Sequence, residues 1–170
     1  MKVINLFGGA DSGKSTTAAE LFVALKKERH YTVEMAREWV KDRVWAGDTC
    51  VLENNNQIYI FAKQLNLLKR LEIGDVNIAI TDSPLLLSII YGTNQSRLFR
   101  NLVLAEFRKF NNINIMLERP NWGYDKAGRL QTYSEALEKD EEIESMLRNY
   151  HIPFQKLASE NALQYVKSVI

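Results

Sequence analysis

The feature that most constrains how this chain can fold is "GGADSGKSTT" at residues 8–17, which matches the pattern G-x-x-x-x-G-K-[ST] without a mismatch. In a phosphate-binding loop of this kind, glycines let the backbone turn tightly, and N–H groups converge on an anion at a helix N-terminus. The flanking sequence fits, because residues 2–7 form a buried-strand pattern and residues 15–28 an amphipathic helix pattern. The stretch therefore predicts a strand, a turn and a helix that together bind nucleotide phosphates.

The positions of this loop have separate expected roles. Lys14 would reach the β- and γ-phosphates of ATP, and the Ser15 hydroxyl would ligate Mg²⁺. Asp11 places a carboxylate in an anion-binding turn, which is tolerable if its side chain points to solvent and its N–H faces inward. We expect the ATP-binding residues to be Gly8, Gly9, Ala10, Asp11, Ser12, Gly13, Lys14, Ser15 and Thr16.

Short apolar runs alternate with helical patterns along the rest of the chain. Strands are predicted at 2–7, 32–36, 76–82, 112–118 and 153–158. Helices are predicted at 15–28, 37–47, 55–73, 85–91, 97–109, 134–149 and 160–169. This alternation predicts an α/β three-layer sandwich with a five-stranded parallel sheet, in one nucleotide-kinase-like P-loop NTPase domain over residues 1–170.

Composition excludes several classes of protein. The chain has 170 residues, of which 46% are apolar, and a formal net charge of +1, so it is not a basic nucleic-acid binder overall. It has one cysteine and no 18-residue apolar run, which predicts neither a disulfide framework nor a membrane span. We expect a cytoplasmic protein, in the host cytoplasm if the source is viral. The oligomeric state cannot be read from the sequence.

A second half of the nucleotide site follows the apolar run at 76–82. Asp82 ends this run, where a carboxylate can hold Mg²⁺ directly or through water, although "DSP" also fits a helix N-cap. The sequence lacks the N-K-x-D element with which small GTPases recognise the base, which argues against that class. The chain is also short for a ring ATPase, which usually has an extra helical domain. The small kinases remain, with Ser83 on the substrate side next to Asp82.

Two further segments favour a kinase. In "AREWV", Glu38 can take a proton from an acceptor hydroxyl, Arg37 can clamp an anion and Trp39 can pack on a flat ring. A surface ion pair and a core tryptophan are the alternative. Residues 119–133 form a lid-like, glycine-containing segment whose Arg119 and Arg129 can neutralise a transferred phosphoryl group, unless they are ordinary surface arginines.

Other charged stretches carry weaker expectations. The stretch "EALEKDEEIESMLR" at 135–148 is expected to be a solvated helix with an apolar stripe. A basic face for a polynucleotide is one interpretation of the cations at 97–109, and a plain exposed helix face is the other. His30 and His151 are far apart in sequence and are expected at helix ends or in loops.

Four stretches carry a family resemblance that covers nearly the whole chain: "GGADSGKSTTAAELF", "EMAREWVKD", "TDSPLLLSIIYG" and "GRLQTYSEALEKDEEIESMLRNYHIPF". Together they resemble short phage-type P-loop kinases. The chain is similar, more distantly, to the ribosylnicotinamide kinase portion of the bifunctional NAD-biosynthesis regulator. "AREWV" is similar to the "E-P-V" stretch of deoxynucleoside kinases, in which the Glu acts as base, and this resemblance gives that role to Glu38.

The resemblance implies an ATP- and Mg²⁺-dependent kinase that acts on a nucleoside, a nucleotide or a modified base. Related phage enzymes imply the hydroxymethyl group of 5-hydroxymethyluracil in DNA as one acceptor. The chain has Ala10-Asp11 where Pro-Gly is common, and "DSP" where nucleoside and thymidylate kinases carry Asp-Arg. The second departure leaves the acceptor open, with Asp82 a rival to Glu38 as base. A nucleotide-binding or ATPase module that is read by a protein partner is the alternative of a different class.

Overall fold

A five-stranded sheet in which all paired strands are parallel organises the chain, as the sequence predicts. The computed structural model describes residues 1–48, 56–92, 96–121, 123–124 and 131–170. The strand order is β2-β3-β1-β4-β5, so β1 lies at the centre. The strands are β1 (Lys2–Phe7), β2 (Val33–Ala36), β3 (Ile78–Thr81), β4 (Asn111–Leu117) and β5 (Gln155–Leu157).

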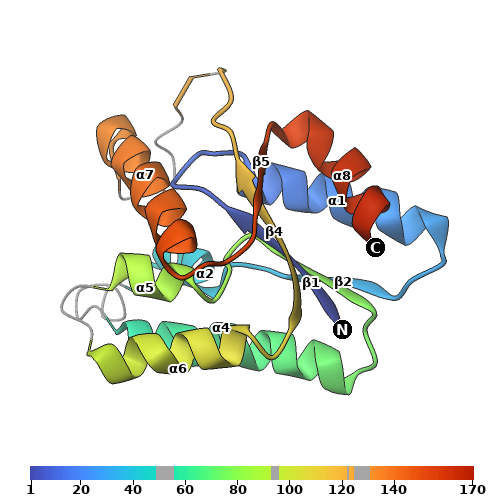
Figure 1. The fold of residues 1–170 in the computed structure, drawn as a ribbon, viewed down its shortest axis with the longest axis horizontal. Coiled ribbons are helices and arrows are strands. Elements are labelled where there is room, and N and C mark those ends of the chain that lie inside the picture. The colour runs from blue at the N-terminus through green and yellow to red at the C-terminus, as the bar shows by residue number, and fades with distance from the viewer. Residues whose placement is uncertain (49–55, 93–95, 122, 125–130) are drawn as a thin grey trace.

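Helices cover both faces of the sheet and form two separate cores. Figure 1 shows α1 and α8 on one face and α4 and α6 on the other. Alternate residues of β1 point to the two sides: Val3 and Phe7 join the α4–α6 core, while Ile4 and Leu6 join the α1–α8 core. The helices are α1 (Lys14–Glu28), α2 (Trp39–Trp45), α4 (Gln57–Ile73), α5 (Leu87–Tyr91), α6 (Arg97–Phe107), α7 (Tyr133–Asn149) and α8 (Ala162–Val169), with a 3₁₀ turn at Ser159–Asn161.

The strand register brings the carboxyl ends of the three neighbouring strands β2, β3 and β1 to one edge. Asn5 of β1 lies opposite Thr81 of β3, and Thr81 in turn lies opposite Ala36 of β2. The segments that leave these strands therefore begin side by side, although they are far apart in sequence. This edge is where open parallel sheets bind their ligands.

Two details of the predicted helices are wrong. The helix predicted at 37–47 begins only at Trp39, because Glu38 has an extended backbone and its N–H donates to the Asp82 side chain at 3.0 Å. In α4, the spacing of Ile58, Phe61, Leu65 and Leu68 suggested one apolar face, but Ile58 is 64% exposed. Its place on the buried face is taken by Ile60 and the polar Gln64.

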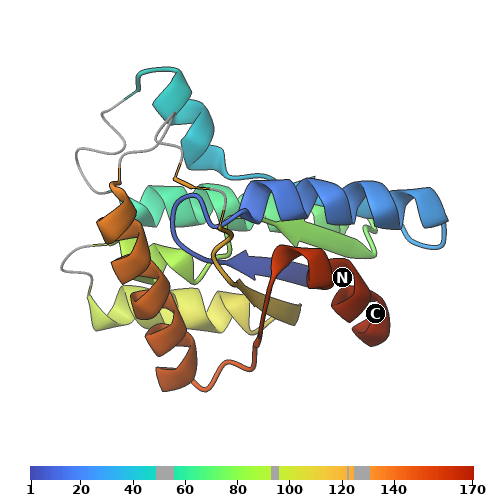
Figure 2. The same ribbon diagram turned by 90° about the horizontal axis from the view of Figure 1, so that it is seen from above.

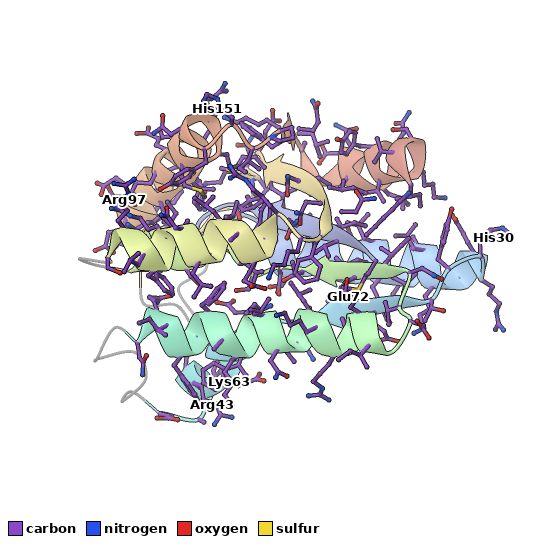
Figure 3. The ribbon with its side chains drawn as sticks, turned by 60° about the horizontal axis from the view of Figure 1, so that its bottom comes forward. His30, Arg43, Lys63, Glu72, Arg97 and His151 are labelled. Atoms are coloured by element: carbon purple, nitrogen blue, oxygen red, sulfur yellow. The ribbon has the colours of Figure 1, made fainter. Side chains whose placement is uncertain are left out.

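Some predictions fall outside the described residues or receive a narrower result. The start of the helix predicted at Asn55, the single cysteine and much of the segment 119–133, including Arg129, lie outside them. Within the described chain, no helix is both long and apolar enough to cross a bilayer. Figure 3 shows His30 and His151 far apart, next to the ends of α1 and α7.

Candidate functional site

The candidate site lies at the carboxyl edge of the sheet, where three strands end. The phosphate loop follows β1, Glu38 lies two residues beyond β2, and Asp82 follows β3 directly. Together they line one cavity of about 960 Å³. Figure 2 shows the loop before α1 at the same end of the molecule as α2 and α7. The loop residues that line this cavity are Ala10, Asp11, Ser12, Gly13, Lys14, Ser15 and Thr16.

Gly8 and Gly9 shape the loop without lining the cavity. A Cβ on Gly8 would lie 2.3 Å from the Ser12 Oγ, and the φ of Gly8 is +148°, which L side chains rarely adopt. Asp11 also has a left-handed backbone, with a φ of +58°. Aspartate tolerates this conformation better than most residues, because its short polar side chain can bond locally. Asp11 therefore fits the turn that its neighbours impose.

Lys14 is folded back onto its own loop. Its ammonium donates to the Gly9 carbonyl at 2.5 Å and lies 3.4 Å from the Ser12 hydroxyl. Burial lowers the pKa of Lys14, and the nearby carboxylates of Glu38 and Asp82 oppose that shift. Lys14 also lines the cavity, so its positive charge can attract phosphate oxygens that enter it.

Two oxygen ligands suited to Mg²⁺ lie together beside the loop. The Ser15 hydroxyl donates to Asp82 Oδ2 at 2.7 Å, and Asp82 Oδ1 accepts the backbone N–H of Glu38 at 3.0 Å. Among the described residues there is no cluster of three His, Cys, Asp or Glu side chains that would form an all-protein metal cage. One hydroxyl and one carboxylate fit Mg²⁺, which usually completes its octahedral shell with water and substrate phosphates.

Glu38 is the half-buried acid of the cavity. Burial raises the pKa of its carboxyl above the ordinary glutamate value, and the neighbouring Lys14 opposes this shift. Glu38 occupies the N-cap position of α2 and is the last residue before that helix. A carboxylate with a raised pKa at the wall of a cavity is well suited to accept a proton from a bound hydroxyl.

The far wall of the cavity consists of residues that the sequence did not indicate as functional. Gln64 of α4 is buried, and its amide donates to the Ala36 carbonyl at 3.2 Å and to the Thr81 hydroxyl at 3.2 Å. Burial raises the pKa of the Tyr91 phenol, and the carboxylate of Glu38 adds to this shift. Other residues of this wall are Gln57, Ile60, Leu87, Ser88 and Tyr124. The one available signal was a glutamine on the apolar side of α4.

The predicted substrate-side residues divide into two groups. Ser83 lines the cavity, as does Glu38. Arg37 is exposed and is not part of the cavity wall. Trp39 is also outside the wall: its ring packs edge-on against Tyr59, with centroids 5.3 Å apart.

The Trp39 ring has its neighbours on the outer surface of α2 and α4. The side chains of Arg43 and Lys63 lie over this ring, at 5.5 and 5.9 Å from its centroid. Figure 3 shows Arg43 and Lys63 close together on that surface. The helix that begins at Trp39 therefore turns the indole away from the cavity and the adjacent Glu38 toward it.

Arg119 lies against the phosphate loop and is held in place by several bonds. Its guanidinium donates to Asp140 of α7 through Nε at 2.9 Å and Nη2 at 2.7 Å, and to the Ala10 carbonyl through Nη1 at 2.8 Å. It also lies over the Tyr133 ring, 5.8 Å from its centroid. Arg129, the other arginine predicted to act from the segment 119–133, lies outside the described residues.

Comparisons with known proteins agree with the α/β fold described above. The chain belongs to a family described as an AAA domain, which it matches over residues 3–163. No curated protein sequence matches it. Its fold is similar to that of two solved kinases, each at under 20% sequence identity, a level that shows the fold alone.

The first of these structures is the deoxyadenosine kinase from M. mycoides with bound dATP. It is 19% identical, with 99% of this chain and 98% of that chain covered and a TM-score of 0.50. The second is the shikimate kinase from Aquifex aeolicus, 16% identical, with 98% and 94% covered and a TM-score of 0.51. The similarity in both cases spans nearly the whole chain, so the sheet and its helices are arranged as in these two structures.

Proposed function

We propose that this protein transfers the γ-phosphate of ATP to a hydroxyl group of a nucleoside, a nucleotide or a modified base. The observation that carries the proposal is a single cavity that contains both the phosphate loop with Lys14 and the half-buried carboxylate of Glu38. The first can hold a donor and the second can activate an acceptor. Phosphoryl transfer requires that both substrates lie in line over the same site.

In the proposed reaction, Glu38 accepts the proton of the acceptor hydroxyl. The acceptor oxygen then forms a bond to the γ-phosphorus, the bond from that phosphorus to the β–γ bridging oxygen breaks, and ADP leaves. Lys14 and the loop amides balance the charge on the phosphates. Ser15 and Asp82 would hold Mg²⁺, which neutralises phosphate charge when it is bound.

The contacts of Asp82 favour Glu38 over Asp82 as the base. Both oxygens of Asp82 already accept hydrogen bonds, one from Ser15 and one from the Glu38 backbone. Asp82 is therefore committed to fixing the end of β3 and to the metal position. The Glu38 carboxyl lines the cavity and has a raised pKa, which are the properties of a proton acceptor.

A nucleoside-like acceptor is supported by the resemblance to short phage-type and deoxynucleoside kinases and by the size of the cavity. Its volume of about 960 Å³ lies at the upper end of the range of small-molecule sites, which suits two substrates together. The hydroxymethyl group of 5-hydroxymethyluracil in phage DNA is one acceptor of this class. Nicotinamide riboside, deoxynucleosides and deoxynucleoside monophosphates are the alternative acceptors.

The test is ADP formation with and without candidate acceptors. ATP and Mg²⁺ are supplied with nucleosides, monophosphates, nicotinamide riboside or DNA that contains hydroxymethyluracil, and ADP is measured for each. We expect little ADP from ATP alone and much more with the correct acceptor. If DNA is that acceptor, its KM should rise steeply with added salt, whereas a free nucleoside should show little salt dependence.

The AAA domain family favours a second candidate, a nucleotide-dependent module whose bound state is read by a protein partner. This function uses the same phosphate loop and needs no hydroxyl acceptor. ADP formation that is the same with every acceptor would support this candidate and contradict the kinase. Replacement of Lys14 would impair either function, so the acceptor dependence is the observation that separates them.

A further inference from the structure

Helix α7 contacts the phosphate loop directly through one carboxylate. Asp140 Oδ1 accepts the backbone N–H of Gly9 at 2.5 Å, and Oδ2 accepts the two bonds from Arg119. The side chains of Arg119 and Asp140 are only 12% and 18% exposed. The carboxylate thus bridges a loop amide and a guanidinium in a place that is largely shielded from water.

This pair fixes consecutive backbone groups of the loop. Asp140 holds the Gly9 N–H, and Arg119 holds the Ala10 carbonyl. The carbonyl between them, that of Gly9, accepts the bond from the Lys14 ammonium. Helix α7 is therefore connected to the Lys14 ammonium through the Asp140 side chain and the Gly9 backbone alone.

The close approach of α7 depends on the absence of a side chain at Gly9. A Cβ at this position would lie 2.5 Å from the Ala136 carbonyl of α7 and 3.1 Å from Asp140 Oδ1. The beginning of α7 is also fixed, because Thr132 and Glu135 form a reciprocal capping box. The helix is thus positioned so that its carboxylate, two turns further on, meets the loop.

We propose that Asp140 is a positioning residue, which, with Arg119, holds the Gly9–Ala10 backbone so that Lys14 stays aimed at the donor phosphates. The inference rests on the proposed function only in that ATP is the donor. It adds a role for a helix outside the phosphate loop. The same network ties the loop to Arg119 at the start of the segment 119–133.

The experiment compares Asp140→Asn, Asp140→Ala and the control Glu141→Gln. The Asn oxygen can still accept the Gly9 N–H, but its amide nitrogen cannot accept from Arg119; Ala removes both contacts. Glu141 is an exposed carboxylate of the same helix, and no contact of it with the loop is found in the described chain. Binding of a non-hydrolysable ATP analogue with Mg²⁺ is measured by calorimetry at neutral pH, together with the melting temperature.

We expect Asp140→Ala to bind the analogue about tenfold or more weakly, since a hydrogen bond to a charged group is lost. Asp140→Asn should recover part of that affinity, because its side-chain oxygen can still accept the Gly9 N–H. Glu141→Gln should match the wild type in both measurements. If Asp140→Ala does not fold, the Asn variant and the control decide the matter.

The proposal is overturned if the folded Asp140 variants melt at lower temperature but keep the wild-type affinity for the analogue. That outcome would mean that Asp140 only stabilises the fold. These measurements involve no acceptor, so they stand even if phosphoryl transfer fails. Conversely, acceptor-independent ADP formation would contradict the proposed function and leave this inference intact.

Discussion

The two halves of the cavity, which we propose hold the donor and the acceptor, are held by different kinds of contact. On the donor side, most of the contacts involve backbone groups of the loop. The Gly9 carbonyl accepts a bond from Lys14, while Asp140 and Arg119 bind the Gly9 N–H and the Ala10 carbonyl. On the acceptor side, side chains from α4 and α5 form the wall, with Gln64 bound to the ends of β2 and β3. A loop that binds through its backbone tolerates few residue types, because its turns require glycines at fixed positions. The side chains of the other half can differ between proteins that use different acceptors.

The largest effect should come from the donor half. Lys14→Ala should lower kcat/KM by about 1000-fold, because a fixed charge on the transferred phosphoryl group is lost. ATP binding should weaken as well, since the same cation contacts the ground-state phosphates. Steady-state kinetics and calorimetry measure the two effects. Lys27→Ala, at an exposed position of α1, should behave as the wild type, and equal losses in both variants would contradict this assignment.

Glu38→Gln should separate the two halves. We expect transfer to fall by about 100-fold or more while ATP affinity changes little, because the base is lost and the phosphate loop is intact. In the wild type, kcat/KM should fall with decreasing pH through the raised pKa of Glu38, since the base must be ionised. This acid limb should therefore lie at a higher pH than that of an ordinary glutamate.

The Glu38→Gln variant is also the control for the pH profile of the wild type. The acid limb should be absent from the residual activity of Glu38→Gln, because the titrating group is gone. An unchanged turnover number would remove Glu38 from the mechanism.

Asp82→Asn should instead raise the Mg²⁺ concentration needed for half-maximal activity, since Asp82 is assigned to the metal.

A smaller effect, on stability, is expected from Gln64→Leu, which tests whether Gln64 holds the ends of β2 and β3 together. The Ala36 carbonyl and the Thr81 hydroxyl would lose their amide partner, at a cost of about 1–3 kcal/mol in the free energy of unfolding. Urea unfolding measures this loss. The same substitution at Gln57, at the start of α4, should cost less, and equal costs would show that the Gln64 bonds do not hold the strand ends together.

The smallest effect on catalysis should follow Trp39→Ala. Because the indole packs on Tyr59 outside the cavity, the KM for the acceptor should stay within about twofold of the wild type, in the range of neutral surface changes. Stability should fall by about 1 kcal/mol through the lost ring contact. A large rise in the acceptor KM, with unchanged stability, would restore the substrate role predicted from the sequence.

Local patterns predicted the architecture well, for physical reasons. Each predicted strand was a short segment rich in apolar residues, and a strand of the sheet overlaps each of these segments. The start of α2 was predicted too early, because the Glu38 N–H bonds to a side chain 44 residues away in sequence. No local pattern contains that bond.

The candidate site was predictable in part. The phosphate loop was readable because its backbone geometry requires glycines, a lysine and a hydroxyl at fixed spacing. Asp140 lies in a charged stretch that was expected to be solvated, and only its contact with Gly9 reveals its position. Gln64 and Tyr91 were missed for the same reason, since the packing of α4 against β2 and of α5 against α4, rather than sequence spacing, brings them to the cavity.

The central claim is that the two halves of this cavity act on one phosphoryl group. The most direct measurement follows the label of γ-³²P-ATP in the presence of Mg²⁺ and the panel of acceptors, with separation of acceptor, ATP and inorganic phosphate. With one acceptor, we expect the label to move to that acceptor in amounts equal to the ADP formed. Label that appears only as inorganic phosphate, whatever the acceptor, would contradict this claim.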